Sequence, residues 1–106
     1  MNEVANSSKR KKCFVIMPFS KTIGDRTKQY WTNHYNKFLK PLIEGTGQLD
    51  AYRSSPVRED IISNIITHLI MDPVVVADIT DYNPNVLWEL GVRQSFKSGT
   101  VTIKQI

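Results

Sequence analysis

The chain has 106 residues, of which 41% are hydrophobic and 23% are charged, and its formal net charge is +4. These values are typical of one soluble globular domain that is long enough to bury a core, and they exclude a chain too polar to fold. No apolar run reaches the roughly 20 residues that cross a bilayer, and the polar N-terminus has no signal-peptide core. We therefore expect a cytoplasmic protein with no membrane partner.

The positive charge is concentrated at the N-terminus. The stretch Lys9-Arg10-Lys11-Lys12, set against Glu3, supplies +3 of the net charge of +4. The remainder is close to neutral, which disfavours a nucleic-acid partner. We predict that residues 1–11 form a flexible basic tail and that residues 12–106 form the domain.

The first half of the domain contains two predicted strands and two predicted helices. Residues 13–19, CFVIMPF, form a continuous apolar run of the kind found in strands buried on both faces. Apolar residues at helical spacing predict a helix from 29 to 44, in which Pro41 would cause a kink or an early end. Residues 49–53 are predicted to form a short strand, and residues 57–71 form an amphipathic helix.

The second half continues the alternation of strand and helix. Asp72-Pro73 ends the preceding helix, because the residue before proline avoids the helical conformation. Residues 74–79 form the third predicted strand, 85–97 the third helix, and 100–103 begin a fourth strand. This alternation predicts an α/β fold with a doubly wound, mostly parallel sheet in the order 2-1-3-4. Because the chain stops in the fourth strand, we expect a truncated domain or a fragment of a larger parent chain.

Polar residues follow the first and third predicted strands. Pro18 and Phe19 leave the first strand, and the segment from 78 to 85 leaves the third. In a sheet of this order the two strands diverge, and ligands bind in the crevice outside their carboxyl ends. Both segments are therefore expected to line one binding site.

The start of the third helix directs a glutamate towards the same crevice. Asn83 or Asn85 is a good N-cap, and Pro84 is acceptable in the first turn. Glu89 then lies near the helix N-terminus, where the helix dipole favours the ionised carboxylate. Asp78, at the end of the third strand, is expected to face the same space, so that two acids would flank a small ligand.

Such a pair of acids suits glycosyl chemistry. One ionised carboxylate attacks the anomeric carbon, while another group manages the proton of the leaving group. Phe19 or Trp88 would stack on a base. Spacing alone favours structural roles instead, with Asp78 and Asp81 in a turn, the asparagines as caps, Glu89 exposed on a helix and Trp88 in the core.

The segments CFVIMPF, ADIT and NPNVLWELG together resemble the nucleoside 2-deoxyribosyltransferase-like superfamily and its TIR-like relatives, from Lys12 to Lys104. That family has a flavodoxin-like fold, and its nucleophilic glutamate lies in an N-V-x-x-E-L-G segment. The resemblance implies an N-glycosidic bond hydrolase or glycosyl transferase acting on a nucleoside or nucleotide, with Glu89 as the nucleophile. Asp78 would bind the nucleoside or manage protons on its base.

The resemblance also implies which residues contact the ligand. The loop after the first strand would line the base or sugar, and the asparagines would shape the approach to Glu89. The predicted substrate-binding residues are Met17, Pro18, Phe19, Asp81, Asn83, Asn85 and Trp88. Family members complete their sites with later segments, some from a neighbouring subunit, so a homo-oligomer or a larger parent chain is expected.

Two other functions remain open. A TIR-like signalling domain that cleaves NAD or senses a nucleotide would use Glu89 within Trp88-Glu89-Leu90. A noncatalytic module would bind a ligand or a partner protein in the same crevice.

The sequence contains no cysteine and histidine cluster, so we expect no metal and no other cofactor.

Overall fold

The computed structural model describes residues 10–53 and 61–105, which form an α/β fold around a four-stranded, all-parallel sheet. The strand order β2-β1-β3-β4 confirms the predicted doubly wound order, which is that of flavodoxin-like folds. The strands are β1 (Lys11–Ile16), β2 (Leu49–Arg53), β3 (Val74–Asp78) and β4 (Thr100–Ile103).

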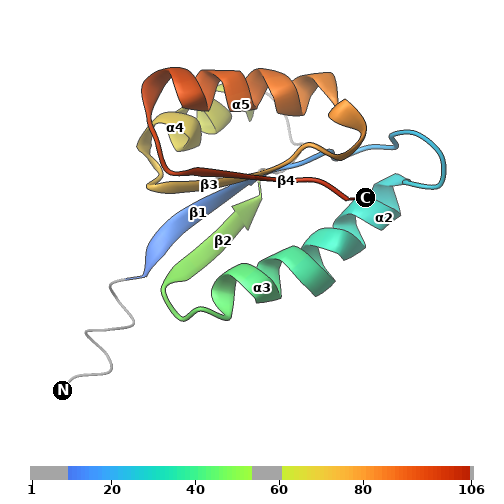
Figure 1. The fold of residues 1–106 in the computed structure, drawn as a ribbon, viewed down its shortest axis with the longest axis horizontal. Coiled ribbons are helices and arrows are strands. Elements are labelled where there is room, and N and C mark those ends of the chain that lie inside the picture. Colours follow the sequence, from blue (N-terminus) through green and yellow to red (C-terminus); the bar gives the residue numbers. More distant parts are fainter. Residues whose placement is uncertain (1–9, 54–60, 106) are drawn as a thin grey trace.

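Helices cover both faces of the sheet (Figure 1). One layer consists of α2 (Lys28–His34), the π-helical segment η1 (Tyr35–Leu39) and α3 (Lys40–Glu44). The other layer consists of α4 (Ile61–Met71) and α5 (Pro84–Phe96), which the 3-10 turn η2 (Thr80–Tyr82) connects to β3. The predicted start of α4 at residue 57 lies outside the described residues. Because the chain leaves β1 towards one layer and β3 towards the other, the switch point lies between these strands.

The helix predicted for residues 29–44 is interrupted by a π-helical turn rather than by a simple kink. Pro41 has no backbone N–H and cannot complete the regular hydrogen-bond pattern. The backbone N–H of Lys40 donates to the carbonyl of Tyr35, five residues earlier, as a π-helix requires. Pro41 then lies in the first turn of α3, where no N–H is needed.

The ends of β1 differ from the prediction. The strand stops at Ile16, so residues 17–19 lie in the following loop. The predicted tail extends to residue 11, but Lys11 begins β1 and the guanidinium of Arg10 donates to the carbonyl of Leu49 at 3.0 Å, so both residues are part of the fold. Residues 1–9 lie outside the described residues, and the flexible tail stays a prediction.

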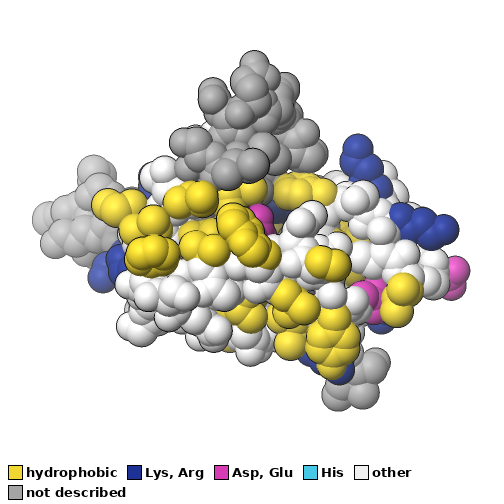
Figure 2. All heavy atoms as spheres, turned by 90° about the horizontal axis from the view of Figure 1, so that it is seen from above, with side chains coloured by type: hydrophobic (Ala, Val, Ile, Leu, Met, Phe, Trp, Pro, Cys, Tyr) yellow, Lys and Arg dark blue, Asp and Glu magenta, His cyan; other side chains and the backbone are white. Residues whose placement is uncertain are grey.

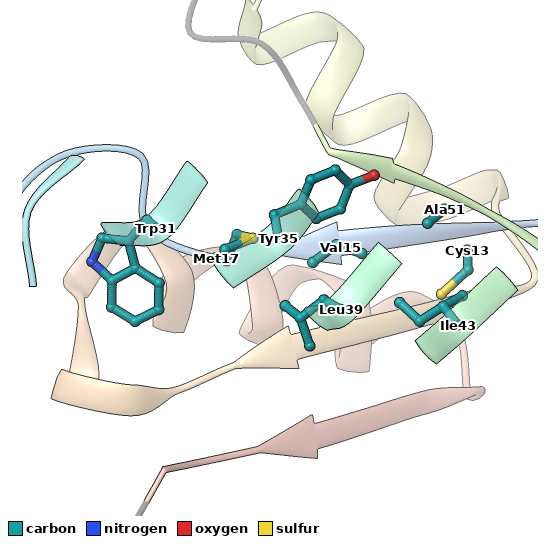
Figure 3. Packing of buried hydrophobic residues seen from close by; sticks show 8 residues of the cluster. All are labelled: Cys13, Val15, Met17, Trp31, Tyr35, Leu39, Ile43 and Ala51. Carbon is teal, nitrogen blue, oxygen red and sulfur yellow. The ribbon is translucent and has the colours of Figure 1, made fainter. Parts of the chain in front are cut away.

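Alternating side chains of the strands form one apolar cluster on each face of the sheet. Cys13 belongs to one of these clusters, and burial there raises the pKa of its thiol to about 11, which makes it an unreactive core residue at neutral pH. The cluster under α2, η1 and α3 contains Cys13, Val15, Met17, Trp31, Tyr35, Leu39, Ile43 and Ala51 (Figure 3). The cluster under α4 and α5 contains Phe14, Ile16, Ile65, Leu69, Val75, Ala77 and Val86.

A buried arginine fastens α5 to the end of α4. Arg93 is 0% exposed, and its guanidinium is surrounded by carbonyl oxygens rather than by water. Burying a cation is costly unless its N–H groups find acceptors, and the last carbonyls of a helix lack helical partners. The acceptors are the carbonyl oxygens of Leu69, Asp72, Pro73, Ser98 and Gly99. Arg93 therefore holds together the end of α4, the turn into β3 and the turn from α5 into β4.

We expect Arg93→Met to lower the free energy of unfolding by roughly 3–5 kcal/mol, because several buried carbonyls would lose their donor. Arg93→Lys should lose most of the same stability, since one ammonium group cannot reach all five acceptors. Urea unfolding followed by circular dichroism measures both values. Arg10→Met, on the surface, is the control and should cost less than about 1 kcal/mol. A lysine variant as stable as the parent would contradict this role of the guanidinium.

Candidate active site

A cavity of about 310 Å³ opens beside the end of β1, between the following loop and the first turns of α5. Its position matches the crevice that the strand order predicts. Its volume is at the lower end of the roughly 300–1,000 Å³ typical of ligand sites. The lining residues are Val15, Met17, Pro18, Phe19, Ser20, Ile65, Asn83, Asn85, Val86, Trp88 and Glu89.

The cavity brings together most of the site residues predicted from the sequence. They come from the loop after β1 and from the beginning of α5, which are far apart in the chain. Those in the cavity wall are Met17, Pro18, Phe19, Asn83, Asn85, Trp88 and Glu89. The sequence analysis missed Val15, Ser20, Ile65 and Val86. Three of these are apolar residues that no polar pattern distinguishes from the rest of the core.

The N-terminus of α5 is fixed by a side-chain cap. The Asn83 side-chain oxygen accepts hydrogen bonds from the backbone N–H groups of Asn85 at 3.0 Å and Val86 at 3.2 Å. Pro84 occupies the first helical position, where its missing N–H has no consequence. This cap sets the start of the helix and thereby places Glu89 in the second turn, at the cavity wall.

Glu89 is a carboxyl group partly removed from water. Among the described residues, none donates a hydrogen bond to it or forms an ion pair with it, and it is the only ionisable side chain in the cavity wall. Burial raises the pKa of Glu89 to about 7. The expectation that the helix dipole keeps the carboxylate ionised is therefore corrected, because desolvation outweighs a dipole effect that fades after the first turn.

Arg53 supports the loop that forms one wall of the cavity. Its Nη2 group donates to the carbonyl oxygen of Pro18 at 2.8 Å. Its guanidinium carbon lies 4.3 Å from the ring centroid of Phe19, a cation–π contact. The sequence analysis assigned Arg53 no role, since its position beside this loop depends on the pairing of β1 with β2.

Asp78 does not join Glu89 at the cavity, which corrects the expected pair of acids. Ala77 points into the cluster under α4 and α5, so its neighbour Asp78 points to the opposite face of the sheet. There its Oδ2 atom lies 3.0 Å from His34 Nε2, and its Oδ1 atom accepts from the Thr80 backbone N–H at 3.0 Å. Asp78 is 1% exposed and connects α2 to the end of β3.

Asp81 also lies outside the described cavity wall, and its contact with the substrate stays a prediction. Its backbone has a positive φ of 66°, and this turn directs its carboxylate towards the loop between β1 and α2. The carboxylate accepts from Thr22 Oγ1 at 2.8 Å and from Arg26 Nη1 at 3.0 Å. Trp31 Nε1 donates to the same Thr22 hydroxyl at 3.1 Å. Asp81 therefore fastens the far end of the loop whose beginning lines the cavity.

No family model matches the chain, and no curated protein matches it. Within residues 10–53 and 61–105, no group of three or more His, Cys, Asp or Glu residues is placed to hold a metal ion. None of the helices in that part of the chain has the length and apolar character needed to cross a membrane.

The raised pKa of Glu89 predicts a pH-dependent cost to stability. Its pKa is about 7 in the folded protein and near the ordinary value of 4.5 in the unfolded chain. Between these values the folded state binds more protons, so the free energy of unfolding falls as the pH rises through this window. We expect Glu89→Gln to raise the free energy of unfolding by roughly 1–3 kcal/mol at about pH 8 and to have little effect near pH 4.5.

Glu44→Gln is the matched control, because it removes the same charge from a different environment. The backbone N–H of Ala51 and the Lys40 ammonium donate to Glu44 and lower its pKa. Urea unfolding at the two pH values should show stabilisation at the higher pH for Glu89→Gln and none for Glu44→Gln. Equal shifts in both variants would mean that net charge, rather than burial of Glu89, is responsible.

Proposed function

We propose that this protein cleaves the N-glycosidic bond of a nucleoside or nucleotide, as a hydrolase or a glycosyl transferase, with Glu89 as the nucleophile. The observation that carries the proposal is the position of Glu89 as the only ionisable side chain in the described cavity wall. The aromatic and amide side chains around it, and the resemblance of NPNVLWELG to a segment with a nucleophilic glutamate, support the same assignment.

In this mechanism a Glu89 carboxylate oxygen attacks the anomeric carbon of the sugar. The bond between this carbon and the base nitrogen breaks, and its electron pair leaves with the base. A water molecule, or the N–H nitrogen of a second base, then attacks the same carbon, releases the carboxylate and gives up its proton to the base that has departed. Water gives hydrolysis, and a second base gives transfer. Positive charge develops on the sugar in both steps, and a poorly solvated carboxylate stabilises it well.

The other cavity residues would position the ligand. Phe19 and Trp88 offer aromatic faces for a base. The Asn83 side-chain oxygen caps α5, which leaves its amide NH2 group for an oxygen of the sugar or base. Asn85 lines the cavity beside it.

The position of Asp78 favours a second candidate substrate, NAD. A nucleobase that leaves as an anion needs a proton, and Asp78 is on the wrong face of the sheet to supply it. Nicotinamide in NAD carries a positive charge and leaves as a neutral molecule, so its departure needs no acid. Cleavage of NAD, as in TIR-like enzymes, is therefore the alternative that we retain.

Release of a free base tests the proposal. The parent protein, Glu89→Gln and Asp78→Asn are each incubated with ribonucleosides, deoxyribonucleosides, their monophosphates and NAD, and the products are separated by chromatography. We expect release from at least one compound and a loss of roughly 10³-fold or more in Glu89→Gln, because the nucleophile is gone. Asp78→Asn should keep its activity per folded molecule, within about tenfold, since Asp78 lies away from the cavity.

Two outcomes would contradict the assignment. Full activity in Glu89→Gln would remove Glu89 from the mechanism. No release from any compound, in a sample shown by circular dichroism to be folded, would favour a noncatalytic binding module.

The pH dependence of kcat/KM gives a separate prediction. The nucleophile must be ionised, and the pKa of Glu89 in the free protein is raised to about 7. We expect kcat/KM to rise about tenfold per pH unit below this value and to level off above it. A value of kcat/KM that falls as the pH rises through 7 would indicate that Glu89 acts as an acid instead.

A further inference from the structure

Arg53, the last residue of β2, lies at the carboxyl end of the sheet beside the candidate active site. It pairs with Val15 of β1 and contacts the loop that follows that strand. Pro18, Phe19 and Ser20 of this loop line the cavity. Arg53 is partly exposed to solvent, so a ligand at this end of the sheet can reach it.

The guanidinium of Arg53 has few partners for a partly buried cation. Within the described residues only its Nη2 group donates a hydrogen bond, to the carbonyl oxygen of Pro18 at 2.8 Å. Its Nε–H group is buried and has no acceptor there. Burial lowers the pKa of the guanidinium, and none of the described carboxylates forms an ion pair with it. A buried cation without a counter-ion is costly, and an anionic ligand would offset that cost.

The other described arginines have the partners that Arg53 lacks. Arg10 and Arg26 each form an ion pair with an aspartate, at 3.6 and 3.0 Å. Arg93 donates to five backbone carbonyl oxygens. In this part of the chain, Arg53 is therefore the arginine with the most capacity left for a ligand.

Two aromatic rings orient the guanidinium. Its central carbon lies 4.3 Å from the ring centroid of Phe19 and 5.7 Å from that of Tyr35. These cation–π contacts, together with the hydrogen bond to Pro18, hold the planar group beside the loop. A guanidinium that is already oriented suits phosphate, which it binds through two parallel N–H···O hydrogen bonds.

We propose that Arg53 binds a phosphate group of the ligand whose glycosidic bond faces Glu89, so that the substrate is a nucleotide rather than a nucleoside. The cavity wall itself offers no cation, because Glu89 is the only ionisable side chain among its described residues. Figure 2 looks onto the layer of α4 and α5 and shows hydrophobic side chains gathered across it. Ser20, also in the wall, offers a hydroxyl donor. The inference rests on the proposed function for the identity of the ligand, whereas the anion site itself does not.

Binding measurements test the phosphate contact without catalysis. Isothermal titration calorimetry uses the 106-residue chain with Glu89→Gln, which lacks the nucleophile, and compares nucleosides with their 5′-monophosphates. We expect at least one monophosphate to bind roughly 10–100-fold more tightly than its nucleoside, because charge-assisted hydrogen bonds add to the affinity. Adding Arg53→Gln should reduce this affinity ratio to about twofold or less.

A purely structural role of Arg53 predicts a different result. If Arg53 only supported the loop, Arg53→Gln would weaken both ligands equally and leave the affinity ratio unchanged. Arg53→Lys should keep part of the preference, since it keeps the charge without the planar fork. Arg10→Gln is the matched control, because it removes the same charge next to the opposite end of β1, and it should change the ratio by less than about twofold.

Competition by inorganic phosphate gives a test that needs no Arg53 variant. At constant ionic strength, inorganic phosphate should weaken binding of the monophosphate and leave binding of the nucleoside unchanged. The same comparison of NAD with nicotinamide riboside shows whether the bound phosphate belongs to a dinucleotide. The proposal is overturned if no phosphorylated compound binds more tightly than its unphosphorylated counterpart, or if Arg53→Gln leaves the ratio unchanged in a chain that circular dichroism shows to be folded.

Base release separates this inference from the proposed function. Phosphate-dependent binding that requires Arg53, without release of base from any compound, would keep the anion site and reject the proposed function. Release of base with equal kcat/KM from nucleosides and monophosphates, lowered equally by Arg53→Gln, would keep the proposed function and reject the phosphate contact.

Discussion

The position of α5 depends on the buried guanidinium of Arg93. The N-terminus of this helix is held by the Asn83 cap, its inner face by apolar packing of Val86 on the core, and its last turn by hydrogen bonds from Arg93 to backbone carbonyls. Glu89 lies one helical turn before Arg93, on a neighbouring part of the helix surface. The carboxyl group at the cavity is thus positioned by a cation that does not touch it. The hydrogen-bond acceptors of Arg93 are backbone carbonyls, and the nearby Asp72 carboxylate adds electrostatic attraction.

Helix α5 also carries the Glu89 carboxyl group, which lowers the stability of the fold at neutral pH. The carboxyl group of Glu89, whose pKa is raised to about 7, is partly removed from water and has no hydrogen-bond donor among the described residues. Such a group reduces the stability of the folded protein at neutral pH, and it is also better able to act on a ligand that develops positive charge. The contrast with Asp78 is instructive. Asp78 is buried more deeply, yet it accepts from Thr80 and contacts His34, which makes it part of the framework. Glu89 faces a cavity and has no hydrogen-bond partner among the described residues, whereas Asp78 is buried and has two.

Much of the fold could be predicted from the sequence, because apolar runs and helical periodicity directly report burial. The strand order and the cavity segments followed from the alternation of strands and helices. The roles of Asp78 and Arg93 did not follow, although signals existed. Alternation along β3 puts Asp78 on the face opposite Ala77, and spacing along α5 puts Arg93 three residues after Leu90 and seven after Val86, on the buried side. The role of Asp81 depends on a positive φ that its sequence does not specify.

The central claim is that the Glu89 carboxylate forms a bond with a sugar, and intact-protein mass spectrometry can test it directly. A nucleoside with fluorine at the 2-position of the sugar forms a slowly hydrolysed intermediate, because fluorine destabilises the oxocarbenium-like transition state. If Glu89 is the nucleophile, the protein gains the mass of one fluorinated sugar, peptide mapping places it on Glu89, and Glu89→Gln gains none. Base release without an adduct on Glu89, or an adduct on another residue, would contradict the account.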